Sequence, residues 1–107
     1  MIRGIKVMPD FGSSGLWGLP DGVMIQFEDL KIPKSLIKRF DKWVDFYDLK
    51  CHKRPEYSMI PEQLDICNTE GRKLARIIKD LFPRRHVEYW AEFMRNGKIA
   101  LSKETIE

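Results

Sequence analysis

The sequence predicts an α+β fold in which a small, mainly antiparallel sheet carries two helices packed on one of its faces. Three patterns support this prediction. A short alternating segment near the N-terminus is typical of a strand, two longer segments have apolar residues at helical spacing, and an alternating segment with a turn signal near the C-terminus predicts a hairpin. The sheet would consist of the N-terminal strand and the C-terminal hairpin. The 107 residues, 43% of them hydrophobic, fit a single domain spanning residues 1–107.

The first predicted strand covers residues 5–8, where Ile5 and Val7 alternate with Lys6 and Met8 and the following proline ends the strand. The next dozen residues are rich in Gly, Ser, Asp and Pro, so they are predicted to form a loop. The segment VMIQFEDL after this loop predicts a short extended piece followed by a turn.

The first predicted helix lies in the segment PKSLIKRFDKWVDFYDLK, whose apolar residues recur at helical spacing. Ser35 is expected to cap its N-terminus, because a serine side chain accepts a backbone N–H there. On the opposite side, three aspartates interleaved with lysines form one stripe. The apolar positions are Leu36, Ile37, Phe40, Trp43, Val44 and Tyr47, and the acidic stripe consists of Asp41, Asp45 and Asp48.

The second predicted helix runs from about Pro61 to Leu81 and ends before Phe82-Pro83. Gly71 falls on its apolar stripe, where a glycine costs about 1 kcal/mol relative to alanine. We expect the compensation to be a close approach to another element, the first helix. The core positions of the second helix are Leu64, Cys67, Leu74, Ile78 and Leu81, with Ile77 beside them.

The C-terminal part predicts a β-hairpin, because apolar residues alternate over residues 87–93 and an Asn-Gly dipeptide follows. A two-residue loop would mix apolar and polar residues on each face. A three-residue loop gives one apolar face, so we expect the register that pairs Phe93 with Ile99 and Ala91 with Leu101.

Two further expectations concern the outward-facing residues of this hairpin and the C-terminal residues that follow it. Trp90 and Met94 are expected to point away from the helices and to form a candidate contact patch if they stay exposed. The final residues, SKETIE, are expected to fray.

The stretch DFGSSGLWG after the first strand has no accompanying catalytic pattern. It lacks the Lys and Ser/Thr that follow a phosphate-binding loop, and no recognisable base accompanies Ser13 or Ser14 as a nucleophile. We interpret it as a structural turn in which Leu16 and Trp17 fold back over the core. The indole N–H of Trp17 then needs an acceptor, which would fix the loop.

No cofactor, metal ion or small-molecule substrate is expected, and the protein is not expected to be an enzyme. Cys51, His52 and Cys67 match no zinc-ligand spacing, and Cys67 lies on an apolar helix stripe. The two cysteines indicate reduced thiols in a cytoplasmic setting. No apolar run is long enough to cross a bilayer, so we expect no membrane association.

The charge distribution suggests two kinds of partner. The net charge is +3, and a basic stripe on the second helix could follow a phosphate backbone. The acidic stripe on the first helix is a salt-bridged face or a surface that complements a basic partner. The basic stripe consists of Arg72, Arg76, Lys79, Arg84 and Arg85.

Several segments together resemble a group of small bacterial proteins over about residues 5–90. These segments are KVMPDFGSSGLWG, KIPKSL, DKWVDFY and EGRKLARIIKDL. The shared pattern is an N-terminal strand ending in Asp-aromatic, a Ser-x-x-Leu-Trp-like loop, a Trp-x-x-x-Tyr helix and a Gly-x-x-Leu-Ala helix. It is matched here by Asp10-Phe11, Ser14 with Leu16-Trp17, Trp43 with Tyr47, and Gly71 with Leu74-Ala75.

The resemblance is to immunity proteins of polymorphic toxin systems, including contact-dependent growth inhibition. It implies a protein without chemistry of its own that binds and neutralises a cognate toxin. The net basic charge departs from the acidic character typical of inhibitors of nuclease toxins. The candidate toxin contacts are Asp41, Asp45, Asp48, Trp17 and Trp90, and the alternative function is RNA binding through the basic stripe.

Overall fold

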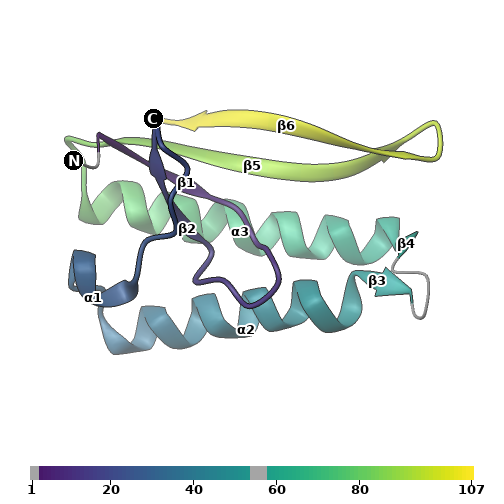
Figure 1. Cartoon of the computed structure of the whole chain (residues 1–107), viewed down its shortest axis with the longest axis horizontal. Helices are drawn as coiled ribbons and strands as arrows, with labels where there is room; N and C mark the ends of the chain where they lie inside the picture. Colours follow the sequence, from purple (N-terminus) through teal and green to yellow (C-terminus); the bar gives the residue numbers. More distant parts are fainter. Residues whose placement is uncertain (1–2, 54–57) are drawn as a thin grey trace.

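The structure, a computed structural model, describes residues 3–53 and 58–107. Two long helices lie on one side of a four-stranded sheet, and a two-stranded ribbon lies at one end of the helices (Figure 1). The elements in chain order are β1 (Gly4–Val7), β2 (Leu16–Leu19), α1 (Phe27–Leu30), α2 (Lys34–Lys50), β3 (His52–Lys53), β4 (Ser58–Met59), α3 (Pro61–Leu81), β5 (His86–Arg95) and β6 (Lys98–Ile106).

The main sheet has the strand order β2-β1-β5-β6 and is mixed. β1 runs antiparallel to β2 and parallel to β5, while β5 and β6 form an antiparallel hairpin. The predicted α+β class is confirmed, with one parallel pair in a mainly antiparallel sheet. α3 packs against β5 and β1, and α2 packs against α3.

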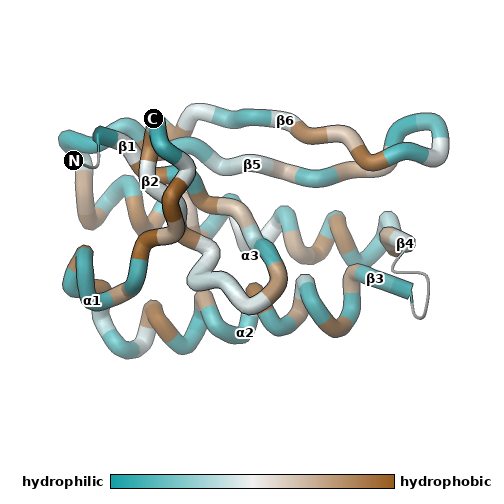
Figure 2. The backbone as a smooth tube through the Cα atoms, viewed as in Figure 1, coloured by the Kyte–Doolittle hydropathy of each residue, from teal (hydrophilic) through white to brown (hydrophobic). Residues whose placement is uncertain are grey.

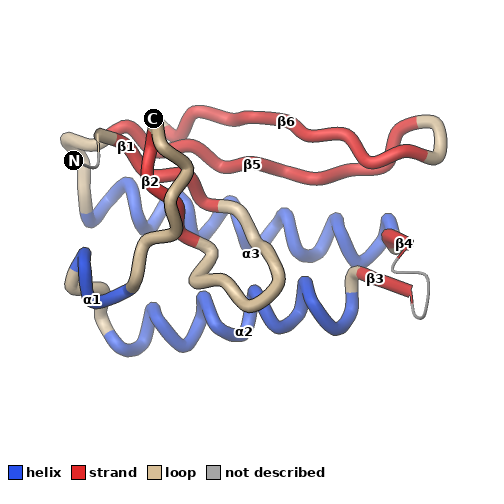
Figure 3. The backbone as a smooth tube through the Cα atoms, viewed as in Figure 1, coloured by secondary structure: helices blue, strands red, loops and turns tan. Residues whose placement is uncertain are grey.

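Strand β2 corrects the prediction of one long loop after β1 (Figure 3). Leu16 is completely buried, as predicted, and Trp17 lies opposite Lys6 on the other face of the sheet. This strand could not be recognised from the sequence, because its four residues, LWGL, do not alternate between apolar and polar types, although their burial in the structure does alternate. The expected turn after residue 26 is the one-turn helix α1.

Helix α2 begins one residue after Pro33, so Ser35 lies inside the helix and is not its cap. The backbone N–H groups of Leu36 and Ile37 both donate to the Pro33 carbonyl, at 3.0 Å each. Proline suits this position because its fixed φ fits the helix start and its missing donor costs nothing there. The predicted bounds of α3 are confirmed.

Gly71 does allow a close approach, but its neighbour is Tyr89 of β5 and not the first helix. A Cβ atom at Gly71 would lie 2.4 Å from the Tyr89 ring, inside any real contact distance. The sheet therefore lies on α3 at the point where the helix has no side chain.

The predicted hairpin register is wrong: the loop has two residues, and Phe93 pairs with Ala100 and Ala91 with Ser102. Asn96 and Gly97 both have positive φ, 51° and 75°, which is the geometry of a type I′ turn. This turn matches the strand twist, and its local preference outweighs the pairing of apolar side chains. As a consequence of this register, two apolar residues of β6, Ile99 and Leu101, are exposed.

The C-terminal residues do not fray as expected, because β6 stays paired with β5 through Ile106. Arg72 of α3 holds the Glu104 carboxylate with its Nη2 at 2.9 Å, and Arg76 donates to the Glu107 carbonyl. Contacts with α3, which is distant in the sequence, therefore order this polar segment. The local sequence alone does not predict that order.

One hydrophobic core joins the sheet, α2 and α3. Hydrophobic and hydrophilic residues alternate along both long helices (Figure 2). Each helix therefore has an apolar side for the core and a polar side for solvent. The largest fully buried side chains include Tyr89, Phe40, Ile5, Leu16 and Leu74.

Candidate functional site

The loop between β1 and β2 descends from the sheet to α2, as Figure 1 shows. The Phe11 ring packs on the rings of Tyr47 and His52, with centroid distances of 5.7 and 4.8 Å. The Gly12 N–H donates to Asp48 Oδ2 at 3.4 Å. The loop tip and the C-terminal half of α2 therefore form one continuous surface.

We call this the loop–helix surface and define it by Asp10, Phe11, Asp41, Asp45 and Asp48. Phe11 is 50% exposed, and three of the four acids are exposed around it. It combines an accessible aromatic ring with negative charge. The three aspartates predicted on α2 are all part of it, whereas Asp10 and Phe11 were not predicted as site residues.

Asp48 is the least exposed acid of this surface. Burial raises the pKa of its carboxyl, the Gly12 N–H opposes that shift, and the nearby charges of Asp45 and Asp10 add to it. Its Oδ1 atom is buried and has no hydrogen-bond partner within residues 3–53 and 58–107. Asp48 thus has a structural role in holding the loop, whereas Asp41 and Asp45 are accessible to a partner.

A buried polar cluster supports the loop–helix surface from below. The Tyr47 hydroxyl donates to Glu92 Oε1 at 2.6 Å, and His52 Nδ1 lies 3.0 Å from the Tyr47 carbonyl oxygen. Burial raises the pKa of the Glu92 carboxyl, although the Tyr47 hydrogen bond and the nearby His52 oppose the shift. Burial and Glu92 together raise the pKa of Tyr47, so its hydroxyl remains a donor.

Glu92 makes the stability of the protein depend on pH. Because its pKa is higher in the folded than in the unfolded state, the folded state binds the proton more readily between the two values. Stability contributed by this group therefore decreases as pH rises through that window. We expect Glu92→Gln to reduce this slope in urea unfolding measured over an acidic pH series, and a slope equal to that of the original protein would contradict the assignment. Asp41→Asn, which removes an exposed acid of α2, is the matched control.

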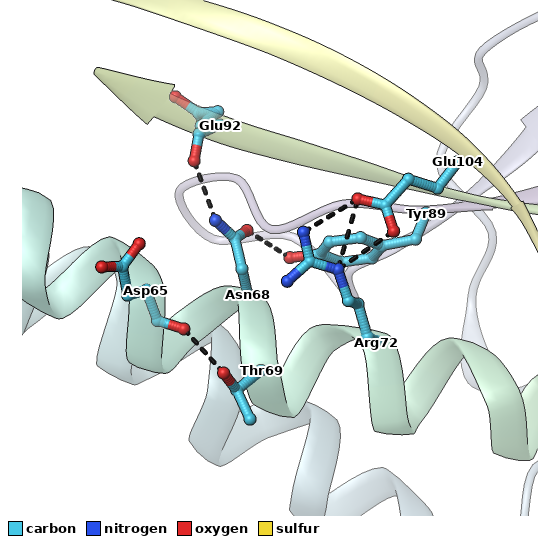
Figure 4. Close-up of polar contacts among 7 residues, drawn as sticks. All are labelled: Asp65, Asn68, Thr69, Arg72, Tyr89, Glu92 and Glu104. Atoms are coloured by element: carbon cyan, nitrogen blue, oxygen red, sulfur yellow. Dashed lines mark hydrogen bonds and ion pairs between the residues drawn. The ribbon is translucent and has the colours of Figure 1, made fainter. Parts of the chain in front are cut away.

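A second polar network joins α3 to the hairpin (Figure 4). Asn68 accepts from the Tyr89 hydroxyl at 2.6 Å and donates to the Glu92 carbonyl at 2.9 Å. Next to it, Arg72 forms a two-pronged ion pair with Glu104. One pattern in the sequence could have indicated this network. Asn68 lies one turn after Leu64, so it is a polar residue on the apolar stripe of the helix.

A groove of about 440 Å³ lies beside this network, between α3 and the hairpin. Its walls include Asp65 and Thr69 from the helix and Phe93 from the strand. The Thr69 hydroxyl donates to the Asp65 carbonyl at 2.9 Å, as Figure 4 shows. Most polar groups of the groove are thus already paired within the protein, which indicates a structural role.

The two predicted tryptophans lie together on the outer face of the sheet, away from the helices. The Lys6 ammonium lies between them, 4.4 Å from the Trp90 ring centroid and 5.7 Å from that of Trp17. The Trp17 indole N–H donates to the Met8 carbonyl at 2.9 Å, which confirms that it needs and finds an acceptor. Trp90 is half-buried, and Met94, expected beside it in a contact patch, packs against the core.

Glu88 fixes the orientation of Trp90. Burial acts to raise the pKa of Glu88, but hydrogen bonds from the Trp90 indole at 2.9 Å and from His86 at 2.7 Å outweigh it and hold that pKa below its usual value. The structure therefore divides the predicted toxin contacts between two surfaces: the aspartates lie on α2 and the tryptophans on the opposite side of the sheet.

The basic stripe has partners within the protein. Arg72 pairs with Glu104, and Arg76 binds Asp80 at 3.2 Å. Lys79 donates to the carbonyl groups of Pro83 and Arg85, at 3.1 and 2.7 Å. These bonds close the C-terminal end of α3 and fasten β6. Beyond the helix, Arg84 is exposed and Arg85 is half-buried, with the Arg85 guanidinium 6.0 Å from the Phe82 ring centroid.

Neither a metal centre nor a membrane span is present in the part of the chain that the structure describes. No three His, Cys, Asp or Glu side chains there are placed to hold a metal ion. No described helix is both long and apolar enough to cross a membrane. Cys51 and Cys67 are both free and buried.

Comparison with known proteins places the chain in a family. Comparisons with curated proteins and with solved structures each found no match. A family model described as Serratia CdiI immunity protein-like matches residues 3–92, which run from the start of the sheet into β5 and include both long helices. Because this range covers most of the 107 residues, the chain belongs to the Serratia CdiI immunity protein-like family.

Proposed function

We propose that this protein binds and neutralises one cognate bacterial toxin domain by protein–protein contact, in the cytoplasm of the cell that makes it. The observation that carries the proposal is the family match over residues 3–92. In this proposal the protein acts by occupying the toxin and performs no reaction.

We assign the toxin contact to the loop–helix surface. Interfaces concentrate their binding energy in a few aromatic or charged residues near the centre of the contact. Phe11 offers such an aromatic centre, and it rests on Tyr47 and His52. Asp41 and Asp45 supply exposed negative charge on the same side of α2. The complementary toxin surface would be basic, which reconciles a net charge of +3 with an acidic contact.

The outer face of the sheet is the second candidate contact. There the rings of Trp17 and Trp90 enclose the Lys6 ammonium. Both indole N–H groups are used within the protein, so a partner would contact only the ring surfaces. For that reason we place this patch after the loop–helix surface.

The decisive experiment begins with capture of the partner. The tagged protein is used to isolate partners from its native bacterium, with nuclease-treated and untreated lysates in parallel. One stoichiometric protein partner that survives nuclease and high salt supports the immunity function. RNA that disappears on nuclease treatment supports instead the alternative, in which the exposed Arg84 and the half-buried Arg85 bind RNA.

The contact surface is then tested by calorimetry with the captured toxin domain. We expect Asp41→Asn/Asp45→Asn to weaken binding about 10- to 100-fold, because two charges opposite a basic surface are lost. The matched control is Asp21→Asn/Glu62→Gln, which removes two exposed acids outside the loop–helix surface. Equal affinity of both double variants would remove Asp41 and Asp45 from the contact, and Trp17→Ala and Trp90→Ala would then test the outer face.

A further inference from the structure

Strand β6 forms an open edge of the main sheet. It is nine residues long and has β5 as its only neighbour in the strand order. The two-residue turn makes Arg95 and Lys98 a hydrogen-bonded pair, so the backbone groups of Lys98 and of every second residue after it point toward β5. The backbone groups of the residues between them point outward.

These outward-pointing residues are Ile99, Leu101, Lys103 and Thr105. Their backbone N–H and C=O groups have no hydrogen-bond partner among residues 3–53 and 58–107. Proteins that keep an edge strand unpaired usually protect it with proline, a bulge or several charges. β6 has no proline, and its pairing with β5 has no bulge. It carries the charged residues Lys98, Lys103 and Glu104, but Ile99 and Leu101, which lie between the two lysines, are each 52% exposed.

We propose that two copies of this protein pair through β6, antiparallel and about a two-fold axis at Leu101. Each copy contributes four strands, so the two sheets join into one sheet of eight. In this register the outward-pointing backbone groups of Leu101 face those of Leu101 of the partner subunit, and those of Ile99 face Lys103 of the partner subunit.

The side chains favour this register over its neighbours. On the outer face, the exposed Leu101 packs against its own copy, with Ile99 of each subunit diagonally beside it. On the helix side, Lys98 comes opposite Glu104 of the partner subunit, where Arg72 already fixes the carboxylate. A one-residue slip places backbone groups already bonded to β5 in the interface. A two-residue slip in either direction separates Lys98 from Glu104.

The dimer leaves the loop–helix surface uncovered, because that surface belongs to α2 and the β1–β2 loop and lies away from β6. Toxin binding and self-association therefore occupy different parts of the molecule. The inference about β6 stands independently of the proposed function.

The test measures the oligomeric state by analytical ultracentrifugation over a concentration series. We expect the original protein to dimerise and Leu101→Lys to weaken dimerisation at least about tenfold, because two like charges then meet at the axis. Thr105→Lys introduces the same charge on the same outward side of β6 but beyond the proposed apolar contact, so it should dimerise nearly as well. Circular dichroism checks that both variants are folded.

A cross-link fixes the register independently. Under mild oxidation, Leu101→Cys should form a disulfide-linked dimer, because each new thiol lies opposite its own copy, whereas Thr105→Cys should not. The native Cys51 and Cys67 are buried and do not compete. A monomer at every concentration overturns the proposal, as does equal cross-linking of both cysteine variants. Loss of toxin capture by Leu101→Lys in a monomeric protein would assign the edge to a toxin strand and also overturn self-pairing.

Discussion

Replacing Gly71 by alanine is expected to destabilise the protein by about 2–3 kcal/mol, although alanine is the better helix former. The added Cβ atom would lie 2.4 Å from Tyr89 Cε1 and 2.5 Å from its hydroxyl oxygen. Tyr89 is fully buried, and its hydroxyl is held by Asn68 at 2.6 Å. The ring therefore cannot move away without losing that hydrogen bond or displacing β5.

Urea unfolding measures this effect. The matched control is Thr69→Ala in the same helix. Its exposed side chain donates to the Asp65 carbonyl, and the effect of its removal should stay below about 0.5 kcal/mol. A double-mutant cycle with Tyr89→Leu should recover part of the loss, because the smaller side chain frees the space that the new methyl group needs. An increase in stability from Gly71→Ala alone would show that the helix and β5 are less tightly packed than the distances indicate.

Gly71 also marks the limit of what the sequence alone predicts about the fold. Apolar periodicity predicted both long helices and the hairpin, because each of these elements contains enough turns or alternations to be recognised locally. Periodicity also indicated that a glycine on an apolar stripe must have a close neighbour. It did not identify Tyr89, because that contact joins α3 to a strand that follows a separate turn and depends on tertiary packing.

Two errors in the sheet have local physical causes. β2 was missed because its four residues include a glycine, follow a Gly-Ser-rich stretch and show no alternation of apolar and polar residue types. The predicted hairpin register was wrong because the geometry of the Asn-Gly turn, and not the pairing of apolar side chains, determines the register. Positive φ at both Asn96 and Gly97 fixes the two-residue turn and leaves Leu101 exposed.

The sequence predicted only the part of the candidate site that depends on local spacing. A stripe of aspartates on one helix face can be recognised from spacing alone, and the structure places Asp41 and Asp45 on an exposed surface. The contribution of Phe11 could not be predicted, since it depends on a loop that descends from the sheet to α2. The Glu104 partner of Arg72 was missed because it lies in a segment that was expected to fray.

Removal of the Asn68 amide is expected to cost about 2–4 kcal/mol, the second large effect. Asn68→Ala leaves the Tyr89 hydroxyl without its acceptor and the Glu92 carbonyl without its side-chain donor, both in buried surroundings. It also leaves a small cavity between α3 and β5. Urea unfolding at neutral pH measures the loss, and an effect no larger than that of Thr69→Ala would contradict a stabilising role for the network.

The variant Asn68→Asp distinguishes the effect of the lost hydrogen bond from the effect of the cavity. It keeps the side-chain shape and the acceptor for Tyr89 but replaces the amide donor by a carboxylate oxygen. At neutral pH a negative charge would then face the Glu92 carbonyl in a buried site, so this variant should be destabilised at least as much as Asn68→Ala. Protonation supplies an O–H donor again, and burial makes the folded state bind that proton more readily than the unfolded chain. Stability of Asn68→Asp relative to the original protein should therefore recover as pH falls and decrease as pH rises. Asn68→Ala should show no such recovery, and parallel pH profiles of the two variants would mean that the amide donor contributes little.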